Sequence, residues 1–360
     1  MHVAYYITAH GYGHGVRSCD ILRALLAMDP EARVTVTTDL PEAFLRSRLK
    51  GVDGRLAVRP GAFDVGMVQK DSIRVDVEAT LLEALELAEE RSRLVDYEAE
   101  FLRAEGADRV VSDIPAIPIE AAAEAGLPAL AVGNFSWDWI YAPFVARDAR
   151  WRRVIRLFEE GYRETRLLLK LPFSPRMPIF PKHVDIPLLA RPGTVRRKDL
   201  AAQTGADPGR RWVLLSFTSL NWSDEALQEV DALDDYEFFT VKPLAWTEHR
   251  RLHAVDREVI CFSDVLASVD VAITKPGFGI LSDCVANAKP VIYAEREDFI
   301  EYPLLERELK RYLRHGHIPA VDLYAGRLGP ALHAIESAPA PPESMPGGGA
   351  EVAARWILEA

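Results

Sequence analysis

The stretch VAYYITAHGYGHGVRSCDILRALL, residues 3–26, decides the fold of the N-terminal half of the chain. Residues 3–7 are an unbroken apolar run, which is typical of a strand buried on both faces of a parallel sheet. Apolar side chains then recur at helical spacing, with polar ones between them, at Val16, Cys19, Leu22 and Leu26. The stretch therefore predicts a strand, a glycine-rich turn and a helix.

The same alternation of strand and helix patterns continues along most of the chain. Further strands are predicted in ARVTVTTDL, GRLAVRP, DRVVSD, PALAVGNFS, RWVLLSF, YEFFTV, EVICF, VAITK and PVIYAE. Helical patterns separate most of these runs, as in right-handed crossovers between parallel strands. The pattern predicts an α/β protein with doubly wound, Rossmann-like sheets.

The length and the prolines predict two such domains. A chain of 360 residues is long for one core. Six prolines crowd one segment, which cannot hold a long helix or a central strand: Pro172, Pro175, Pro178, Pro181, Pro187 and Pro192. We predict an N-terminal domain over 1–175, a connection over 176–195 and a C-terminal domain over 196–336. A flexible linker is predicted over 337–350, with a helix over 351–360 that packs back on the first domain.

Composition narrows the class of protein. The net charge of −11 opposes binding to nucleic acid, which rests on clustered Lys and Arg. Three cysteines lie far apart, too few for a disulfide framework and without the spacing of a metal site. The N-terminus has no signal-peptide pattern, and no apolar run approaches the ~20 residues of a spanning helix. We expect a cytoplasmic protein.

Ligands of doubly wound sheets bind beyond the carboxyl ends of the strands, and two such domains create a cleft there. This location selects the turn His10–Gly15, Asp113 in VVSDIP and GNFSWDW at 133–139 in the first half. In the second half it selects SFTS, with Ser216 and Thr218, and ITKPGFGILSDCVANAKP at 273–290.

The last of these stretches carries the chemistry of a phosphate site. Gly277 and Gly279 follow a strand and open a helix, so backbone N–H groups can approach an anion. The first turn of this helix has no acidic side chain, and Lys275 adds a positive charge. Asp283, one turn further on, could accept hydrogen bonds from both ribose hydroxyls. The alternative is a tight turn with a solvated Asp283.

ITKPGFGILSDCVANAKPVIY resembles the donor-binding signature of glycosyltransferases with the two-domain GT-B fold, notably the monogalactosyldiacylglycerol synthase and peptidoglycan N-acetylglucosaminyltransferase group. HGYGHG is similar to their N-terminal glycine-rich loop. A closer likeness is to the glycosyltransferase-like N-terminal region of plant L-arabinokinases, in HGYGHGVR, SDIPAIP, NFSWDWIYAPFV and KPGFGILSDCVANAKPVIYAEREDFIEYPLL. The likeness runs from the first strand to about Leu313. It contains no kinase portion, so kinase activity is not implied.

The resemblance implies a role for each matching residue at the donor. Gly277 and Gly279 would hold the nucleotide diphosphate, and Asp283 would hold the ribose, where related sequences more often have Glu. The backbone at Phe262 and Ser263 would receive the base. Asp298 and Glu301 would hold hydroxyls of the donor sugar; otherwise both are solvated loop acids. The resemblance favours a UDP-sugar as donor.

The opening turn supplies candidates for the general base that an inverting transfer needs in addition to the donor site. A base must take the proton of the acceptor hydroxyl, and histidine suits that task. His14 is the candidate base because it matches the histidine that ends the family's glycine loop, and His10 is the fallback. Asp113 could fix the imidazole tautomer. Gly11, Gly13 and Gly15 would let the backbone approach the substrates. The alternative for either histidine is a polar residue that caps the helix.

The chain has no Asp-x-Asp, the usual metal grip of single-domain transferases, and no zinc spacing, so we expect no metal and no cofactor beyond the nucleotide sugar. Asn134, Trp137 and Asp138 are acceptor-side candidates, although packing explains the aromatic residues here slightly better. Residues 151–170 predict an amphipathic segment with six basic and three acidic residues. Contact with a membrane is possible but not favoured over a core helix.

Three functions remain open at this point. The preferred one is a metal-independent inverting glycosyltransferase that acts on a small-molecule, glycan or lipid acceptor. The second is a non-hydrolysing nucleotide-sugar epimerase of the same architecture. The third is a non-catalytic protein that binds nucleotide sugars.

Overall fold

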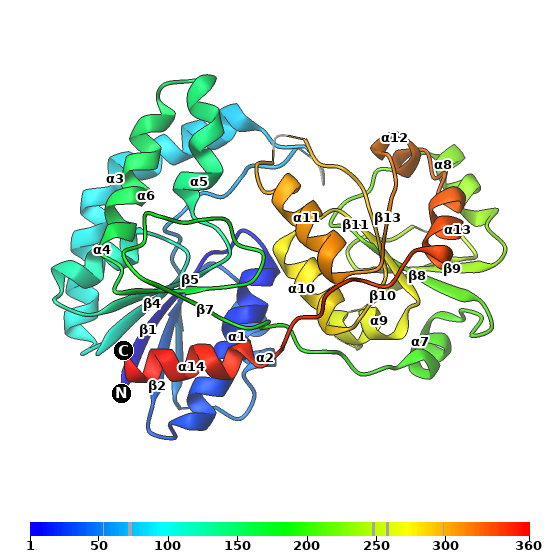
Figure 1. Cartoon of the computed structure of the whole chain (residues 1–360). Helices are drawn as coiled ribbons and strands as arrows, with labels where there is room; N and C mark the ends of the chain where they lie inside the picture. Colours follow the sequence, from blue (N-terminus) through cyan, green and yellow to red (C-terminus); the bar gives the residue numbers. More distant parts are fainter. Residues whose placement is uncertain (53, 71–73, 247–248, 257–258, 298) are drawn as a thin grey trace. The chain divides into compact units, whose positions relative to one another are not determined.

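The computed structural model describes residues 1–360 except 53, 71–73, 247–248, 257–258 and 298. The described chain divides into two compact units. Unit 1 comprises Met1–Val68, Asp76–Leu189 and Pro346–Ala360; unit 2 comprises Gln69–Val75 and Ala190–Met345. Figure 1 shows the course of the chain through both.

The described part of unit 1 is built on a seven-stranded parallel sheet, in the order β3-β2-β1-β4-β5-β6-β7. Its strands are β1 (His2–Ile7), β2 (Arg33–Thr37), β3 (Leu56–Arg59), β4 (Arg109–Asp113), β5 (Ala129–Gly133), β6 (Leu167–Lys170) and β7 (His183–Asp185). Its helices are α1 (Tyr12–Met28), α2 (Glu42–Arg48), α3 (Val77–Ala104), α4 (Ile117–Glu124), α5 (Trp137–Tyr141), α6 (Trp151–Arg163), α14 (Gly349–Glu359) and the short 3₁₀ helix η1 (Ala142–Ala146).

The helices of unit 1 cover both faces of this sheet. One core lies between the sheet and α1, α2 and α14, and it contains Val3, Tyr5 and Ile7 from alternate positions of β1. The helices α3, α4 and α6 pack together over the opposite face (Figure 1). Both faces of β1 are therefore buried, which explains its unbroken apolar run.

Unit 2 repeats the design with a six-stranded parallel sheet in its described residues, in the order β10-β9-β8-β11-β12-β13. Its strands are β8 (Arg211–Ser216), β9 (Tyr236–Val241), β10 (Leu252–Val255), β11 (Val271–Thr274), β12 (Val291–Tyr293) and β13 (His315–His317). Its helices are α7 (Arg197–Thr204), α8 (Asp224–Asp231), α9 (Phe262–Ser268), α10 (Phe278–Ala286), α11 (Tyr302–Tyr312), α12 (Ala320–Tyr324) and α13 (Gly329–Ser337). The predicted fold class of two parallel, helix-flanked sheets is confirmed.

Two predicted elements differ in the structure. The strand predicted in EVICF is wrong for residues 259–262, which lie outside any strand, and Phe262 begins helix α9; Glu258 lies outside the described residues. The strand of this region is β10. Ile260 is buried although it lies outside any strand, so its apolar character reflects packing. The amphipathic segment predicted over 151–170 is also shorter, since α6 ends at Arg163 and Leu167–Lys170 is strand β6.

The apolar face of α6 is covered by unit 1 itself. Trp151, Val154, Phe158 and Tyr162 are buried, and α6 packs against α3, α4 and α5. This face is a core face. Among the described residues, no helix combines the length and apolar character required to cross a bilayer.

The proline-rich segment and the C-terminus belong largely to unit 1. The predicted connection 176–195 contains the edge strand β7, and the boundary between the units falls after Leu189. Prolines are tolerated here because β7 is an edge strand. Beyond Met345 the chain returns to unit 1, where the backbones of Leu188 and Gly349 are hydrogen bonded (3.0 Å) and α14 packs on α1. Gly349 has no room for a side chain, because an added Cβ would lie 2.1 Å from the carbonyl oxygen of Pro187.

Candidate active site

A histidine and an aspartate meet at the carboxyl edge of the unit 1 sheet. Asp113 is the last residue of β4 and pairs in register with Ile7, the last residue of β1. His14 lies in the first turn of α1, which begins after the turn that follows β1. Its Nδ1 lies 2.9 Å from Oδ1 of Asp113. The two residues predicted as base and orienting carboxylate therefore lie within hydrogen-bond distance.

Arg17, which the sequence analysis did not assign to the site, completes this cluster. One helical turn after His14, it donates from Nε to Oδ2 of Asp113 at 2.7 Å and from Nη2 to Oδ1. Ser18 Oγ donates to the same carboxylate at 2.8 Å. Asp113 is fully buried, and these donors satisfy its charge.

The contacts in this cluster keep Asp113 ionised and His14 neutral. Burial alone would raise the pKa of Asp113, but Arg17 and His14 outweigh it and hold that pKa far below its usual range. Burial lowers the pKa of His14, the positive charge of Arg17 lowers it further, and together they outweigh Asp113. The imidazole of His14 is therefore neutral at neutral pH, as a general base must be.

The tautomer of His14 follows from the same contacts. Nη2 of Arg17 also lies 3.0 Å from Nδ1 of His14, and a guanidinium can only donate. Nδ1 can either accept from Arg17 or donate to Asp113. We assign the second, because a carboxylate is the stronger acceptor and Arg17 already donates to it. Nε2 then carries the lone pair that can take a proton.

A second histidine–aspartate pair lies in the same loop region. Nε2 of His10 is 3.1 Å from Oδ1 of Asp64, which also accepts from Thr8 Oγ1 at 2.9 Å. Trp137 Nε1 donates to the other oxygen at 2.8 Å. Burial opposes the charged form of His10, but Asp64 outweighs it and raises the pKa of His10. His10, the fallback base, is thus more protonated at neutral pH than His14.

Gly66 fixes the place of the His10 ring. Its φ is +38°, and an added Cβ would lie 2.4 Å from Cγ of His10. Asp64 and Gly66 were not predicted, although GAFDVG after the strand pattern GRLAVRP was a usable signal: an acid between two glycines at a predicted carboxyl edge.

The three glycines of the opening turn have different environments. An added Cβ at Gly11 or Gly13 would meet nothing within 4 Å, so backbone is open at both positions. At Gly15 a Cβ would lie 2.6 Å from Leu40 and Phe44. Close packing of α1 therefore accounts for Gly15, and the predicted approach to a substrate applies only to Gly11 and Gly13.

The acceptor-side candidates are largely engaged within unit 1. Trp137 is only 4% exposed and stacks on Tyr141 with ring centroids 5.4 Å apart. Asn134 accepts from Arg17 and donates to the carbonyl of Pro172 at 2.6 Å. Burial raises the pKa of Asp138, whose Oδ1 is enclosed by protein. Trp137 and Asn134 thus support the site, and packing is the better explanation of the aromatic residues.

In unit 2, the predicted phosphate loop lies at the carboxyl end of β11. Gly277 is the N-cap of α10, with no side-chain cap and no acid in the first turn, and Gly279 is exposed. Lys275 and Asp283 are half-buried. Thr274 Oγ1 donates to the carbonyl of Ser216 at 3.0 Å, which ties this turn to the end of β8; Thr218 is exposed just beyond.

The loop after β12 is anchored by a buried arginine. Arg296 donates from Nη1 to the carbonyl of Pro276 at 3.2 Å and lies 3.6 Å from Glu301. Burial lowers the pKa of Arg296 to about 10 and raises that of Glu301, with the attraction between them opposing both shifts. Glu301, a candidate for the donor sugar, is therefore in an ion pair. Asp298, the other candidate, lies outside the described residues.

The segment that the resemblance assigns to the nucleobase of the donor lies at the start of α9. Phe262 and Ser263 are half-buried, and the carbonyl of Ser263 lies against Gly193, where an added Cβ would be 2.1 Å away. Asp264 accepts from the backbone N–H of Thr194 at 2.8 Å. Within the described ranges, no three His, Cys, Asp or Glu side chains group as metal ligands.

This architecture was compared with those of known proteins. No family model matches the chain. A curated relative, the L-arabinokinase of Arabidopsis thaliana, is 30% identical over 373 residues; the match covers 99% of this chain, which spans about a third (34%) of that protein.

Solved structures match over 99% of this chain. The glycotransferase of kitacinnamycin has a TM-score of 0.65, 16% identity and 95% coverage of its own chain. Medicago truncatula UGT71G1 complexed with UDP-glucose has a TM-score of 0.63, 11% identity and 93% coverage of its own chain. Arabidopsis thaliana UGT89C1 complexed with UDP-L-rhamnose has a TM-score of 0.61, 14% identity and 98% coverage of its own chain. These likenesses show the GT-B fold and confirm the predicted resemblance.

Proposed function

We propose that this chain, which has the GT-B fold, is an inverting glycosyltransferase that moves a sugar from a nucleotide sugar, a UDP-sugar by preference, to a hydroxyl acceptor. The observation that carries the proposal is the pair of His14 and Asp113 at the carboxyl edge of unit 1, with the neutral imidazole that burial and the charge of Arg17 favour by lowering its pKa.

The chemistry requires one proton transfer and one displacement. Nε2 of His14 takes the proton of the acceptor hydroxyl while its oxygen bonds to the anomeric carbon. The bond from that carbon to the phosphate oxygen breaks, and the nucleoside diphosphate leaves with the electron pair. Asp113 stabilises the imidazolium that forms. Backbone N–H groups at the start of α10 and Lys275 would stabilise the departing phosphate.

The donor assignment is tested by thermal-shift measurements with UDP, GDP, dTDP, ADP and their sugar conjugates. A nucleotide that binds only the native state raises Tm, so the preferred base gives the largest shift. Asp283→Ala is expected to abolish that shift, because its carboxylate is assigned to the ribose. An unchanged shift in this variant would refute the assignment.

Turnover separates the proposed transfer from its two alternatives. The preferred conjugate is incubated with and without candidate acceptors. Transfer, or slow hydrolysis to the free sugar, supports the proposal. An epimerised conjugate formed without acceptor identifies an epimerase, and binding without any turnover identifies a binding protein.

The pH dependence of kcat/KM identifies the base. His14 acts when neutral, and its folded pKa lies below the ordinary 6.5, so the rate should fall only as pH drops below that value. The raised pKa of His10 would instead place the acid limb above 6.5. An acid limb above 6.5 that disappears in His10→Gln would contradict the assignment of His14.

A further inference from the structure

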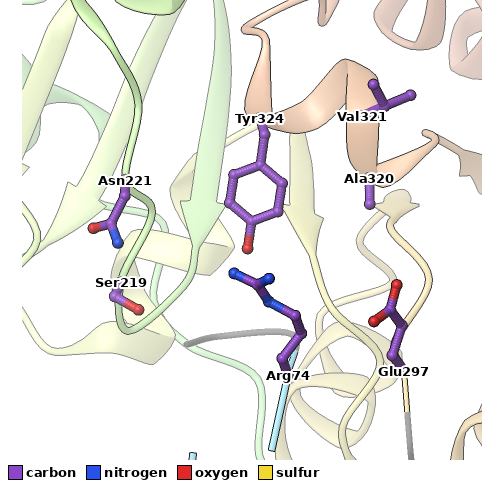
Figure 2. A pocket seen from close by; sticks show the side chains of 7 residues that line it. All are labelled: Arg74, Ser219, Asn221, Glu297, Ala320, Val321 and Tyr324. Carbon is purple, nitrogen blue, oxygen red and sulfur yellow. The ribbon is translucent and has the colours of Figure 1, made fainter. Parts of the chain in front are cut away.

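Unit 2 contains a cavity of about 370 Å³, within the size range of small-molecule sites. It is lined by Arg74, Ser219, Asn221, Glu297, Ala320, Val321 and Tyr324 (Figure 2). Its walls come from the loop after β8, the loop after β12, helix α12 and the segment between β3 and α3 that contains Arg74. Ser219 belongs to the predicted stretch SFTS, and Glu297 belongs to the loop that the resemblance places at the donor sugar; the other lining residues were not predicted as part of a site.

The topology of the sheet brings this cavity next to the predicted phosphate turn. β11 lies between β8 and β12, so the loops that follow these two strands flank the turn from β11 into α10. Neighbouring strands are only about 4.8 Å apart. In addition, Arg296, the residue before Glu297, is hydrogen bonded to Pro276 in that turn. A group attached to a diphosphate at α10 would therefore have the cavity within reach.

The lining has the chemistry of a sugar site. Figure 2 shows the guanidinium of Arg74 below the hydroxyl of Tyr324, with Asn221 and Ser219 to one side and the carboxylate of Glu297 to the other. These groups include both donors and acceptors, as sugar hydroxyls require because each of them donates and accepts.

The formal charges of the lining cancel. Arg74 is the cation of the lining and Glu297 is the anion. A sugar carboxylate would gain Arg74 but would face the carboxylate of Glu297, and a sugar ammonium would face Arg74. An uncharged sugar can hydrogen bond to both without repulsion.

Arg74 reaches unit 2 from the first half of the sequence. It lies between β3 and α3, where Gln69 and Val75 form an antiparallel bridge and Lys70 N–H donates to the carbonyl of Arg74 at 3.0 Å. These backbone contacts fix the position from which the side chain enters the cavity.

We propose that this cavity receives the glycosyl group of the nucleotide sugar, and that Arg74 and Glu297 together restrict it to uncharged sugars. The proposal rests on the proposed function, because it requires a nucleotide-sugar donor at α10. It makes Arg74 a specificity-determining residue, although the rest of the donor site comes from the second half of the sequence.

The test compares the binding of a nucleoside diphosphate with that of its sugar conjugates by titration calorimetry. The probes are UDP, UDP-glucose, UDP-galactose, UDP-xylose and UDP-glucuronate, or the same series on the base that the thermal-shift screen prefers. In Arg74→Ala, the affinity for the preferred neutral conjugate should fall by about tenfold, the value of a charged hydrogen bond, while the affinity for UDP stays unchanged. Glu297→Gln should improve the binding of UDP-glucuronate. Arg307→Ala, at an exposed arginine of α11, is the matched control and should change neither.

Each contrary outcome has a separate meaning. If the conjugates bind to Arg74→Ala as well as to the wild type, the cavity is not the sugar site. If the wild type prefers UDP-glucuronate, the proposed restriction to uncharged sugars is wrong. If no nucleoside diphosphate binds to the wild type, the proposed function itself fails.

Discussion

Replacement of His14 by alanine is expected to lower kcat by about 10²–10⁴-fold, the usual contribution of a positioned general base. Nε2 of His14 is the proton acceptor in the proposed reaction. Among the described residues of this turn, His14 is the one whose imidazole is both neutral and hydrogen bonded to a buried carboxylate. The measurement is single-turnover transfer or hydrolysis of the preferred nucleotide sugar.

Two controls give this experiment its meaning. The affinity for the nucleoside diphosphate should not change, because the residues assigned to it belong to unit 2. His10→Ala, the matched variant four residues earlier, should lose less activity than His14→Ala. A larger loss in His10→Ala would make His10 the base and Asp64 its orienting partner.

Replacement of Arg17 by methionine is expected to destabilise the protein by about 3–5 kcal/mol, because it leaves the buried charge of Asp113 without its main partner. The double variant Arg17→Met/Asp113→Asn should recover much of this loss. Urea unfolding of wild type, both single variants and the double variant gives the coupling energy. A loss under ~1 kcal/mol in Arg17→Met would show that the pair is not a stabilising contact.

The same variants have a defined pH dependence. The folded pKa of Asp113 lies below its ordinary 3.8, so the charged group contributes stability above that value and loses it as pH falls. The difference in unfolding free energy between wild type and Arg17→Met should therefore narrow as pH falls below 3.8. Loss of Arg17 should also raise the pKa of His14, because the guanidinium lowers it in the wild type.

Local patterns predicted nine of the described strands, β1 to β5, β8, β9, β11 and β12, but not β6, β7, β10 or β13. β1 and β8 are buried on both faces, so each has an unbroken apolar run that can be recognised without tertiary information. β10 was missed because two of its four residues, His253 and Ala254, are only partly buried. The more apolar run 259–262 nearby lies outside the sheet, with Ile260 buried and Val259 62% exposed.

The candidate site was predicted only where its residues lie at the ends of recognisable strands. Asp113 ends β4 and His14 follows β1, so strand order alone brings them together. Asp64 lies in a stretch, GAFDVG, that could have been recognised as a site candidate, but Asp64 is far from His10 in the sequence, so its contact with His10 depends on tertiary folding. Arg17 was visible as a residue one turn after His14, but its direction toward Asp113 depends on how α1 packs on the sheet.

Because α14 belongs to unit 1, it also determines which of the two units can finish folding first during synthesis on the ribosome. Domains usually fold as they emerge, starting from the N-terminus. Here all of unit 2 is synthesised before α14, whose Ala353 and Ile357 are buried in the same core as the first helix. A nascent chain therefore has unit 2 complete while unit 1 still exposes apolar surface over α1, and this stage is the one at which a chaperone would find a binding site.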